Sequence, residues 1–312
     1  MILTVTLNVA IDRAYRIVEL KPFTVMRVSD CICTAGGKGL NIIRVAKITG
    51  ADVLATGFAG GHAGAFVCEQ LKNKGIPNDF VFVSGETRSC INVIDEKTGK
   101  QTEFLEPGFT VTPEDISVFL QKFDLLLQWA DVVTISGSVP AGCGDTIYAD
   151  LVQRVKGKGK KVILDSSGKL LAQGIKAHPT MIKPNRDELT SLTGFSPADN
   201  QQLADCARQL HKKGIPYVVI SLGRDGALLA CDEGLFQGTT PDIPVVNTVG
   251  CGDAMVAAFA VGFEKGYRAA EMLRFALAVS TGNAMTAETG FYRPDDLHWL
   301  LDHCQVKCLS QP

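Results

Sequence analysis

A glycine-rich turn that opens directly into an apolar helical run is the part of this sequence best suited to chemistry. The turn is Asn247-Thr248-Val249-Gly250-Cys251-Gly252-Asp253, and the run is Ala254-Met255-Val256-Ala257-Ala258-Phe259. The first turn of a helix has backbone N–H groups without partners and the positive end of the helix dipole, and glycines let a ligand approach the backbone. The sequence therefore predicts an anion-binding site here.

Asp253 closes this turn and has two interpretations. As a general base beside a phosphoryl group, it would take the proton of an acceptor hydroxyl. As a helix cap, it would only be favoured by the dipole. In both cases we expect the dipole to favour the ionised carboxylate.

A second glycine cluster, Thr34-Ala35-Gly36-Gly37-Lys38-Gly39-Leu40-Asn41, also precedes a helical pattern. Its backbone amides, together with Lys38 and Asn41, could bind hydroxyls or phosphate. The alternative is a plain turn from a strand to a helix. Taken alone, the cluster favours neither.

Familiar nucleotide fingerprints are absent from both clusters. A P-loop needs Ser or Thr after its Gly-Lys pair, and every Gly-Lys pair here is followed by another residue type. The dinucleotide pattern GxGxxG fails because Ile42 and Met255 stand where the third glycine belongs. These failures disfavour an NAD-dependent oxidoreductase.

Alternating strands and helices must position these clusters. Short apolar runs alternate with helix-like stretches from about residue 130, which predicts a mainly parallel sheet covered by helices on both faces, with ligands at the carboxyl ends of its strands. The predicted strands are 132–135, 161–165, 180–183 and 217–221. The predicted helices are near 143–156, from 185, and over 199–212, 252–265, 268–287 and 294–303.

Residues 16–34 and 80–106 contain strand-like runs, and the hairpin-type turn 96–99 joins two of the runs within 80–106. Such strands cannot enter a parallel sheet through short connections. We expect them to form a small antiparallel lid inserted into one α/β domain over 1–312. Val81, Val83, Ile91 and Val93 would give this lid apolar faces that it cannot bury alone. Pairing of two lids would cover them, which predicts a homodimer.

Composition excludes several classes of protein. The formal net charge of −2 argues against a nucleic-acid partner. No apolar run approaches the roughly 18 residues of a membrane span, so no membrane partner is expected. The ten cysteines are scattered without a CxxC pair, and the N-terminus lacks the features of a signal peptide, so we expect reduced thiols in a cytoplasmic protein.

In this order along the chain, the two glycine clusters resemble the motifs of the ribokinase-like, PfkB-type carbohydrate kinases. Lys183-Pro184-Asn185-Arg186-Asp187-Glu188 is similar to the KPNxxE segment of that family, and Ser221-Leu222-Gly223-Arg224-Asp225-Gly226 is similar to its SLGxxG turn. The resemblance covers essentially the whole chain. It implies the ribokinase-like fold with a β lid, and an ATP-dependent phosphotransferase that uses Mg²⁺.

The resemblance also implies roles for individual residues. Asp253 would deprotonate the acceptor hydroxyl, while the amides of Gly250, Cys251 and Gly252 would stabilise the transferring phosphoryl group. Cys251 replaces the usual Ala or Ser, which an anion site built from amides should tolerate. The expected substrate-binding residues are Asp12 for sugar hydroxyls, Arg27, Lys38 and Arg88 for the phosphate already on the substrate, and Gly36, Gly37 and Asn41.

For Asp12 the alternative role is a turn cap, and for Arg88 it is a place on a solvated strand face. The resemblance also implies that Lys183, Ser221, Gly223 and Gly226 bind the nucleotide. Asn283 would lie near the adenine. Mg²⁺ would sit on the nucleotide phosphates with no direct protein ligand, and Asn185 and Glu188 would organise it through water.

A closer resemblance is to the subgroup that phosphorylates ketohexose phosphates, carried by 4–12, 85–88 and 135–140. Runs 85–90, 102–106 and 287–290 are more similar to tagatose-6-phosphate kinases, whereas 163–167 and 183–189 are more similar to 1-phosphofructokinases. The expected reaction is phosphorylation of a ketohexose monophosphate to the bisphosphate, with tagatose 6-phosphate slightly preferred. 1-Phosphofructokinase and 6-phosphofructokinase stay open. A non-catalytic sugar-phosphate sensor is the alternative from another class, and the intact Asp253 turn argues against it.

Overall fold

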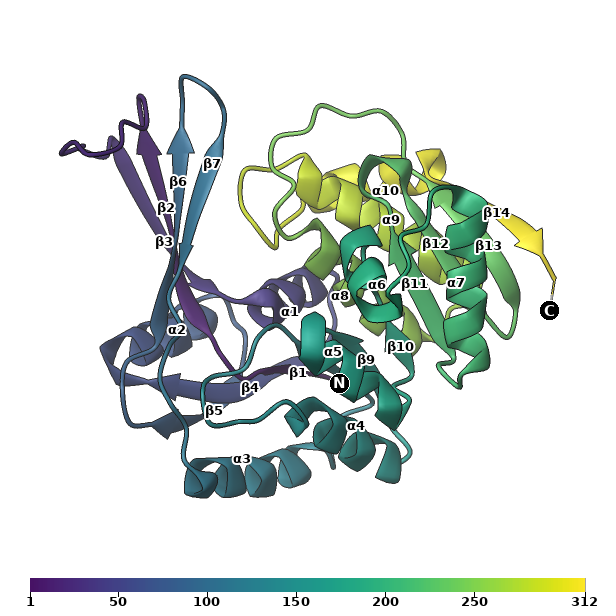
Figure 1. The fold of residues 1–312 in the computed structure, drawn as a ribbon, viewed down its shortest axis with the longest axis horizontal. Helices are drawn as coiled ribbons and strands as arrows, with labels where there is room; N and C mark the ends of the chain where they lie inside the picture. The colour runs from purple at the N-terminus through teal and green to yellow at the C-terminus, as the bar shows by residue number, and fades with distance from the viewer. Residues whose placement is uncertain (312) are drawn as a thin grey trace.

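Ten strands form one central sheet, in the order β14-β13-β12-β11-β10-β9-β8-β1-β4-β5 (Figure 1). The computed structural model describes residues 1–311. The strands from β11 to β5 run parallel, and β12 to β14 continue the sheet antiparallel. Their bounds are β1 Ile2–Thr6, β4 Val53–Gly60, β5 Asn78–Val83, β8 Val132–Ser136, β9 Lys161–Asp165, β10 Met181–Ile182, β11 Tyr217–Ser221, β12 Ala227–Cys231, β13 Gly234–Thr239 and β14 Gln305–Ser310. The predicted mainly parallel sheet is confirmed.

Helices cover both faces of this sheet, because its strands alternate apolar side chains between two cores. In β1, Ile2 packs into one core, and Leu3 and Val5 pack into the other. Helices α1, α8 and α9 supply the first core, and α3, α4 and α7 supply the second. Their bounds are α1 Lys38–Ile48, α2 Gly61–Asn73, α3 Pro113–Leu126, α4 Ile147–Gly157, α5 Gly168–Gly174, α6 Arg186–Thr193, α7 Asn200–Lys212, α8 Cys251–Lys265, α9 Ala269–Ala284 and α10 Pro294–His303. Within residues 1–311, none of these helices combines the length and apolar character needed to cross a bilayer.

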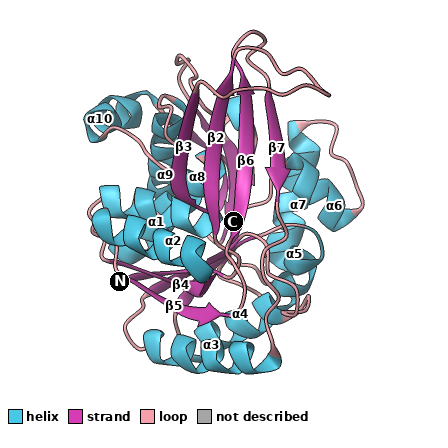
Figure 2. Cartoon of the chain, turned by 90° about the vertical axis from the view of Figure 1, so that its left-hand side faces the viewer, coloured by secondary structure: helices cyan, strands magenta, loops and turns pink. Residues whose placement is uncertain are grey.

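A separate four-stranded sheet, the lid, projects from this body in the order β3-β2-β6-β7 (Figures 1 and 2). Its strands are β2 Ala10–Ile17, β3 Asp30–Gly36, β6 Arg88–Asp95 and β7 Gln101–Leu105. The outer pairs β2/β3 and β6/β7 are antiparallel, as expected, while the central pair β2/β6 is parallel. The connection from β6 to β7 is the predicted turn at 96–99.

One segment assigned to the lid lies elsewhere. Residues 80–83 belong to β5, which pairs with β4 in parallel at the edge of the central sheet. Val81 and Val83 are therefore buried in the core beneath α3 rather than exposed on the lid. The apolar surface of the lid comes instead from Ile32, Phe104 and Leu105, and from the 18–28 loop.

Candidate active site

One cleft of about 1720 Å³ is lined by the lid on one side, and by the carboxyl ends of the central strands and the start of α8 on the other. The topology therefore brings the two glycine clusters to the same cavity. The predicted site residues that line it are Asp12, Gly37, Lys38, Asn41, Arg88, Lys183, Asn185, Glu188, Ser221, Gly223, Gly226, Gly250, Cys251, Gly252 and Asp253.

The Gly250 to Asp253 turn begins α8 as the sequence predicts. Gly250 has a φ of 83°, a left-handed conformation, and a Cβ there would lie 2.7 Å from a Thr289 methyl carbon. The first intrahelical bond runs from Ala254 N–H to the Gly250 carbonyl oxygen, at 2.8 Å. The N–H groups of Gly252 and Asp253 precede that bond, so they are oriented to bind an anion. The Cys251 N–H, which we expected to serve the same purpose, instead donates to the Thr248 carbonyl oxygen at 3.3 Å.

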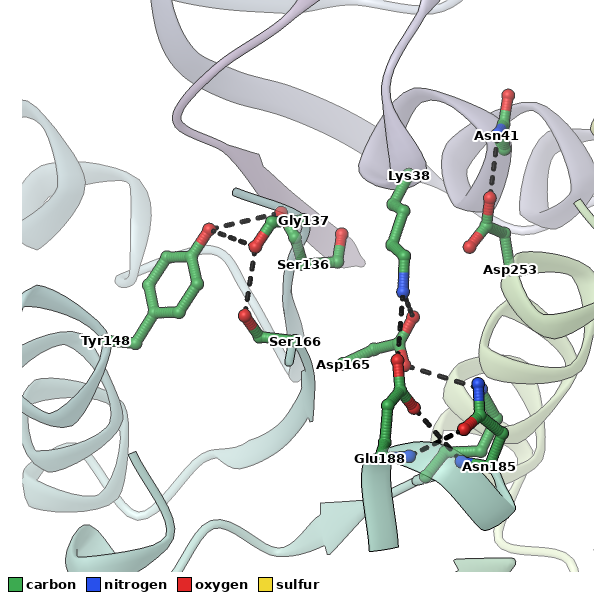
Figure 3. A network of polar contacts seen from close by, with 11 residues as sticks. Lys38, Asn41, Ser136, Gly137, Tyr148, Asp165, Ser166, Asn185, Glu188 and Asp253 are labelled. Atoms are coloured by element: carbon green, nitrogen blue, oxygen red, sulfur yellow. Dashed lines mark hydrogen bonds and ion pairs between the residues drawn. The ribbon is translucent and has the colours of Figure 1, made fainter. Parts of the chain in front are cut away.

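Asp253 is 6% exposed, and its Oδ2 accepts a hydrogen bond of 2.7 Å from Asn41 Nδ2 (Figure 3). Burial and the nearby Asp165 carboxylate raise the pKa of Asp253 to about 6, against the opposing effects of Lys38, Asn41 and Lys183. Desolvation therefore outweighs the preference for the ionised form that we expect from the helix dipole. A carboxylate whose pKa lies near neutrality is well suited to accept a proton.

Asp165 is a site residue that the sequence analysis missed. Its carboxylate is 1% exposed and lies between two ammonium groups. It is 3.4 Å from Lys38 Nζ (Figure 3) and 3.4 Å from Lys183 Nζ. Burial alone would raise its pKa, but these two lysines outweigh burial and lower it. The only signal in the sequence was an acidic residue at the carboxyl end of a predicted strand. The contact fixes both lysine side chains at the cleft.

On the lid side, Asp12 and Arg88 face the cleft from neighbouring strands. Asp12 is on β2, and Arg88 begins β6 in register with Ala10. Burial raises the pKa of Asp12, while Arg44 and Arg88 oppose that rise. Gly36 lies directly against the Asp12 carboxyl, where a Cβ would overlap its atoms. Gly36 therefore makes room for Asp12, although it does not itself line the cleft.

Arg88 is held by the backbone beneath the cleft. It donates to the carbonyl oxygens of Glu106 and Asn8, both at 3.2 Å, and to Ser138 Oγ at 3.3 Å. These bonds fix the guanidinium near Asp12 and argue against the alternative of a solvated strand face.

Asn185 and Glu188 also stabilise the start of α6. Asn185 Oδ1 accepts from Glu188 N–H at 2.8 Å, and Glu188 Oε2 accepts from Asn185 N–H at 3.0 Å, which is a capping box at the start of α6. Glu188 Oε1 still lies 4.0 Å from Lys38 Nζ. One carboxylate thus caps a helix and also contributes to the charge pattern of the cleft.

Besides Gly36, two predicted residues do not line the cleft. Arg27 is exposed in the loop between β2 and β3. Asn283 is fully buried; its Nδ2 donates to the Val249 carbonyl oxygen at 3.0 Å, and its Oδ1 accepts from Gly290 N–H at 2.9 Å. Asn283 therefore ties two loops together, and its amide has no free group to offer an adenine.

The comparisons with known proteins agree with this arrangement. The model of the pfkB family carbohydrate kinases matches residues 5–293. Tagatose-6-phosphate kinase from Staphylococcus epidermidis is 38% identical, with 98% of this chain and 99% of the relative aligned. A possible 1-phosphofructokinase from Thermotoga maritima has a TM-score of 0.90 at 30% identity, over 99% of this chain and 100% of that one. Phosphofructokinase-2 from Escherichia coli, solved in complex with potassium, has a TM-score of 0.90 at 26% identity, over 96% of this chain and 98% of that one. The chain belongs to the pfkB family of carbohydrate kinases.

Proposed function

We propose that this kinase transfers the γ-phosphoryl group of ATP to a hydroxyl of a ketohexose monophosphate, and that tagatose 6-phosphate is its preferred acceptor. The observation that carries the proposal is the buried Asp253 beside the amide turn, in the same cleft as Asp12 and Arg88. A relative named tagatose-6-phosphate kinase at 38% identity supports the preference. Fructose 1-phosphate and fructose 6-phosphate are the competing acceptors.

In the proposed reaction Asp253 takes the proton of the acceptor hydroxyl as its oxygen bonds to the γ-phosphorus. The bond between that phosphorus and the bridging oxygen breaks, and ADP leaves with the electron pair. The amides at the start of α8 stabilise the negative charge on the transferring group.

Asp12 would accept hydrogen bonds from sugar hydroxyls, while Arg88 and Lys38 would pair with the phosphate that the sugar already carries. Nucleotide phosphates would approach Lys183 and the turn of Ser221, Gly223 and Gly226. This division leaves the reacting hydroxyl and the γ-phosphate to meet at Asp253.

The oxygen donors beside the nucleotide region fit Mg²⁺ bound to ATP. Asp165 Oδ1 is buried without a hydrogen-bond partner, although it lies 3.4 Å from Lys183 Nζ. Asn185 and Glu188 line the cleft. Hard oxygen ligands and retained waters are what Mg²⁺ prefers. When bound, Mg²⁺ supplies charge neutralisation on the nucleotide phosphates, and Asn185 and Glu188 would hold it through water.

A panel of acceptors tests the proposal. ADP release is measured with tagatose 6-phosphate, fructose 1-phosphate, fructose 6-phosphate and unphosphorylated ketohexoses at matched concentrations. We expect the highest kcat/KM with tagatose 6-phosphate. A higher value with either fructose phosphate would reassign the substrate, and tight sugar-phosphate binding without ADP release would favour the sensor.

Acid pH should inactivate the enzyme through Asp253. Because the pKa of Asp253 is about 6, kcat/KM should fall about tenfold per pH unit below pH 6. The phosphates of both substrates also titrate near pH 6. A variant must therefore show which group causes the loss of kcat/KM at acid pH, the acid limb of the pH profile. Asn41→Ala removes a hydrogen bond that lowers the pKa of Asp253, and it should move the limb to higher pH. If the acid limb of kcat/KM does not move in this variant, it reports the titration of the substrate phosphates instead of Asp253.

Cys251→Ala should be mild, with kcat within about threefold of wild type. The thiol accepts only a 3.5 Å contact from Asn283 Nδ2, and the proposed charge stabilisation comes from backbone amides. Steady-state kinetics at pH 7.5 would measure the effect. A loss comparable to that of removing Asp253 would show that the thiol itself contributes to turnover.

We also propose that two chains pair through their lids. Phe104 is 58% exposed and Ile32 is 48% exposed on a sheet of only four strands, and the loop that carries Arg27 adds further exposed apolar residues. Sedimentation at micromolar concentration should therefore give a dimer, and Phe104→Asp should give a monomer. A wild-type monomer with full activity would contradict this proposal.

The cysteines support a reducing, cytoplasmic setting. All ten lie within the described residues as free thiols, and Cys31 and Cys308 are exposed. Exposed thiols persist where glutathione and thioredoxin keep them reduced.

A further inference from the structure

Arg44 is a buried cation to which the roles proposed above assign no function. It lies on α1, three residues after Asn41, and is 6% exposed. Its guanidinium donates to the Ala35 carbonyl oxygen, to Asn41 Oδ1, and to the Thr289 carbonyl oxygen at 3.1 Å. These acceptors come from β3, α1 and the loop after α9, so Arg44 joins three segments beneath the cleft.

The chemistry of the donors decides how the Asn41 amide is turned. A guanidinium can only donate, and an ionised carboxylate can only accept. With Arg44 on one side and Asp253 on the other, the single orientation that satisfies both puts Oδ1 toward Arg44 and Nδ2 toward Asp253. The observed bonds have this orientation, with Asn41 Nδ2 at 2.7 Å from Asp253 Oδ2 (Figure 3).

We propose that Arg44 is a positioning residue for the base: it locks the Asn41 amide so that a hydrogen bond always supports the ionised Asp253 carboxylate. The inference rests on the proposed role of Asp253 in phosphoryl transfer. Gly290 adds a packing constraint, because a Cβ there would lie 2.9 Å from Asn41 Cα and 3.1 Å from Arg44 Nη2. The loop thus closes over the pair and leaves little room for another amide orientation.

Other charges also act on these groups, so the test must separate them from Arg44. Asp253 is influenced by Asp165, Lys38 and Lys183. Arg44 is influenced by Asp12, Glu288 and Asp253, and Glu288 is itself paired with Lys74 at 2.6 Å. Apart from the Asp253→Asn variant that assigns the titrating signal, none of these residues needs to be changed to test the role of Arg44.

The experiment titrates Asp253 directly in the full chain labelled with carboxyl-¹³C aspartate, with the signal assigned by its loss in Asp253→Asn. We expect Arg44→Met to raise the titration midpoint by roughly one to two pH units, the shift produced when a hydrogen bond to an ionised group is lost. The acid limb of kcat/KM should move with it, and activity should recover at high pH. A purely structural role would lower activity at every pH.

Two further variants separate orientation from charge. Arg44→Lys keeps the positive charge but not the planar guanidinium, so the titration midpoint of Asp253 should still rise in this variant. A midpoint equal to that of wild type would overturn the proposal. In an Asn41→Ala background, Arg44→Met should shift the midpoint no further, and an additive shift would overturn the proposal as well. If Arg44→Met does not fold, the Arg44→Lys result decides.

Arg154→Met is the matched control, because Arg154 is also hydrogen-bonded, to Asp124 and Asp150, but lies on α4 away from the cleft. Its midpoint should equal that of wild type. The NMR titration requires no sugar acceptor. A wild type inactive with every sugar phosphate would therefore contradict the proposed substrate class, while the midpoints would still decide the role of Arg44.

Discussion

Asp253→Asn should lower kcat by about 10²-fold or more while ATP binding stays near that of wild type. The substitution keeps the size of the side chain and the start of α8, but an amide cannot take the proton of the acceptor hydroxyl. Single-turnover kinetics would measure the chemical step, and calorimetric titration would measure ATP affinity. Near-normal turnover in a folded variant would remove Asp253 as the base.

The same variant has a stability signature that controls for misfolding. The pKa of Asp253 is raised to about 6 in the folded chain, above its ordinary value of 3.8, so the ionised carboxylate destabilises the fold at neutral pH. Asn carries no such penalty. We therefore expect the Tm of Asp253→Asn to match or exceed that of wild type above pH 6, and the difference to shrink as the pH falls toward 4.

Arg88→Ala should lower kcat/KM for the sugar phosphate by roughly 10- to 150-fold, with little change for an unphosphorylated ketohexose. A charge-assisted hydrogen bond to phosphate contributes about 1.5–3 kcal/mol, and about 1.4 kcal/mol corresponds to one factor of ten. Steady-state kinetics with both acceptors gives the two values. The comparison between acceptors matters because a general loss of structure would impair both.

Arg88 also holds Glu106, Asn8 and Ser138, so a thermal melt must accompany the kinetics. Ser138→Ala is the matched control, because it removes one of these contacts and leaves the guanidinium in place. It should retain most of the preference for the phosphorylated acceptor. Equal losses on both acceptors in Arg88→Ala would make a plain sugar or nucleoside kinase the better assignment.

The sequence predicted those parts of the fold that depend on local periodicity. The strands at 132–136, 161–165 and 217–221 were visible as apolar runs, and the helix that follows Asp253 was visible from its turn. Residues 80–83 were misplaced because an edge strand of the central sheet and a lid strand have the same alternation. The pairing of β5 with β4, as between Phe80 and Gly57, distinguishes them, and that contact is non-local.

The site was predicted where a motif marked it and missed where tertiary contacts build it. The Asp253 turn and the Lys38 cluster could be identified from residue types. Asp165 could not, because its importance comes from lying between two lysines that are distant in the sequence. Asn283 was misassigned for the opposite reason: a polar residue on a late helix gave no sign that both ends of its amide are occupied by backbone groups.

The contact between Asn41 and Asp253 joins residues 212 positions apart, and it sets the order in which the protein can be completed on the ribosome. The core beneath α1 takes much of its apolar surface from α8 and α9. Until residue 284 has left the exit tunnel, the nascent chain holds α1 and the central strands with one face uncovered. A pause late in translation would therefore prolong the exposure of this apolar face, and the base reaches its supporting amide only after α8 has been made.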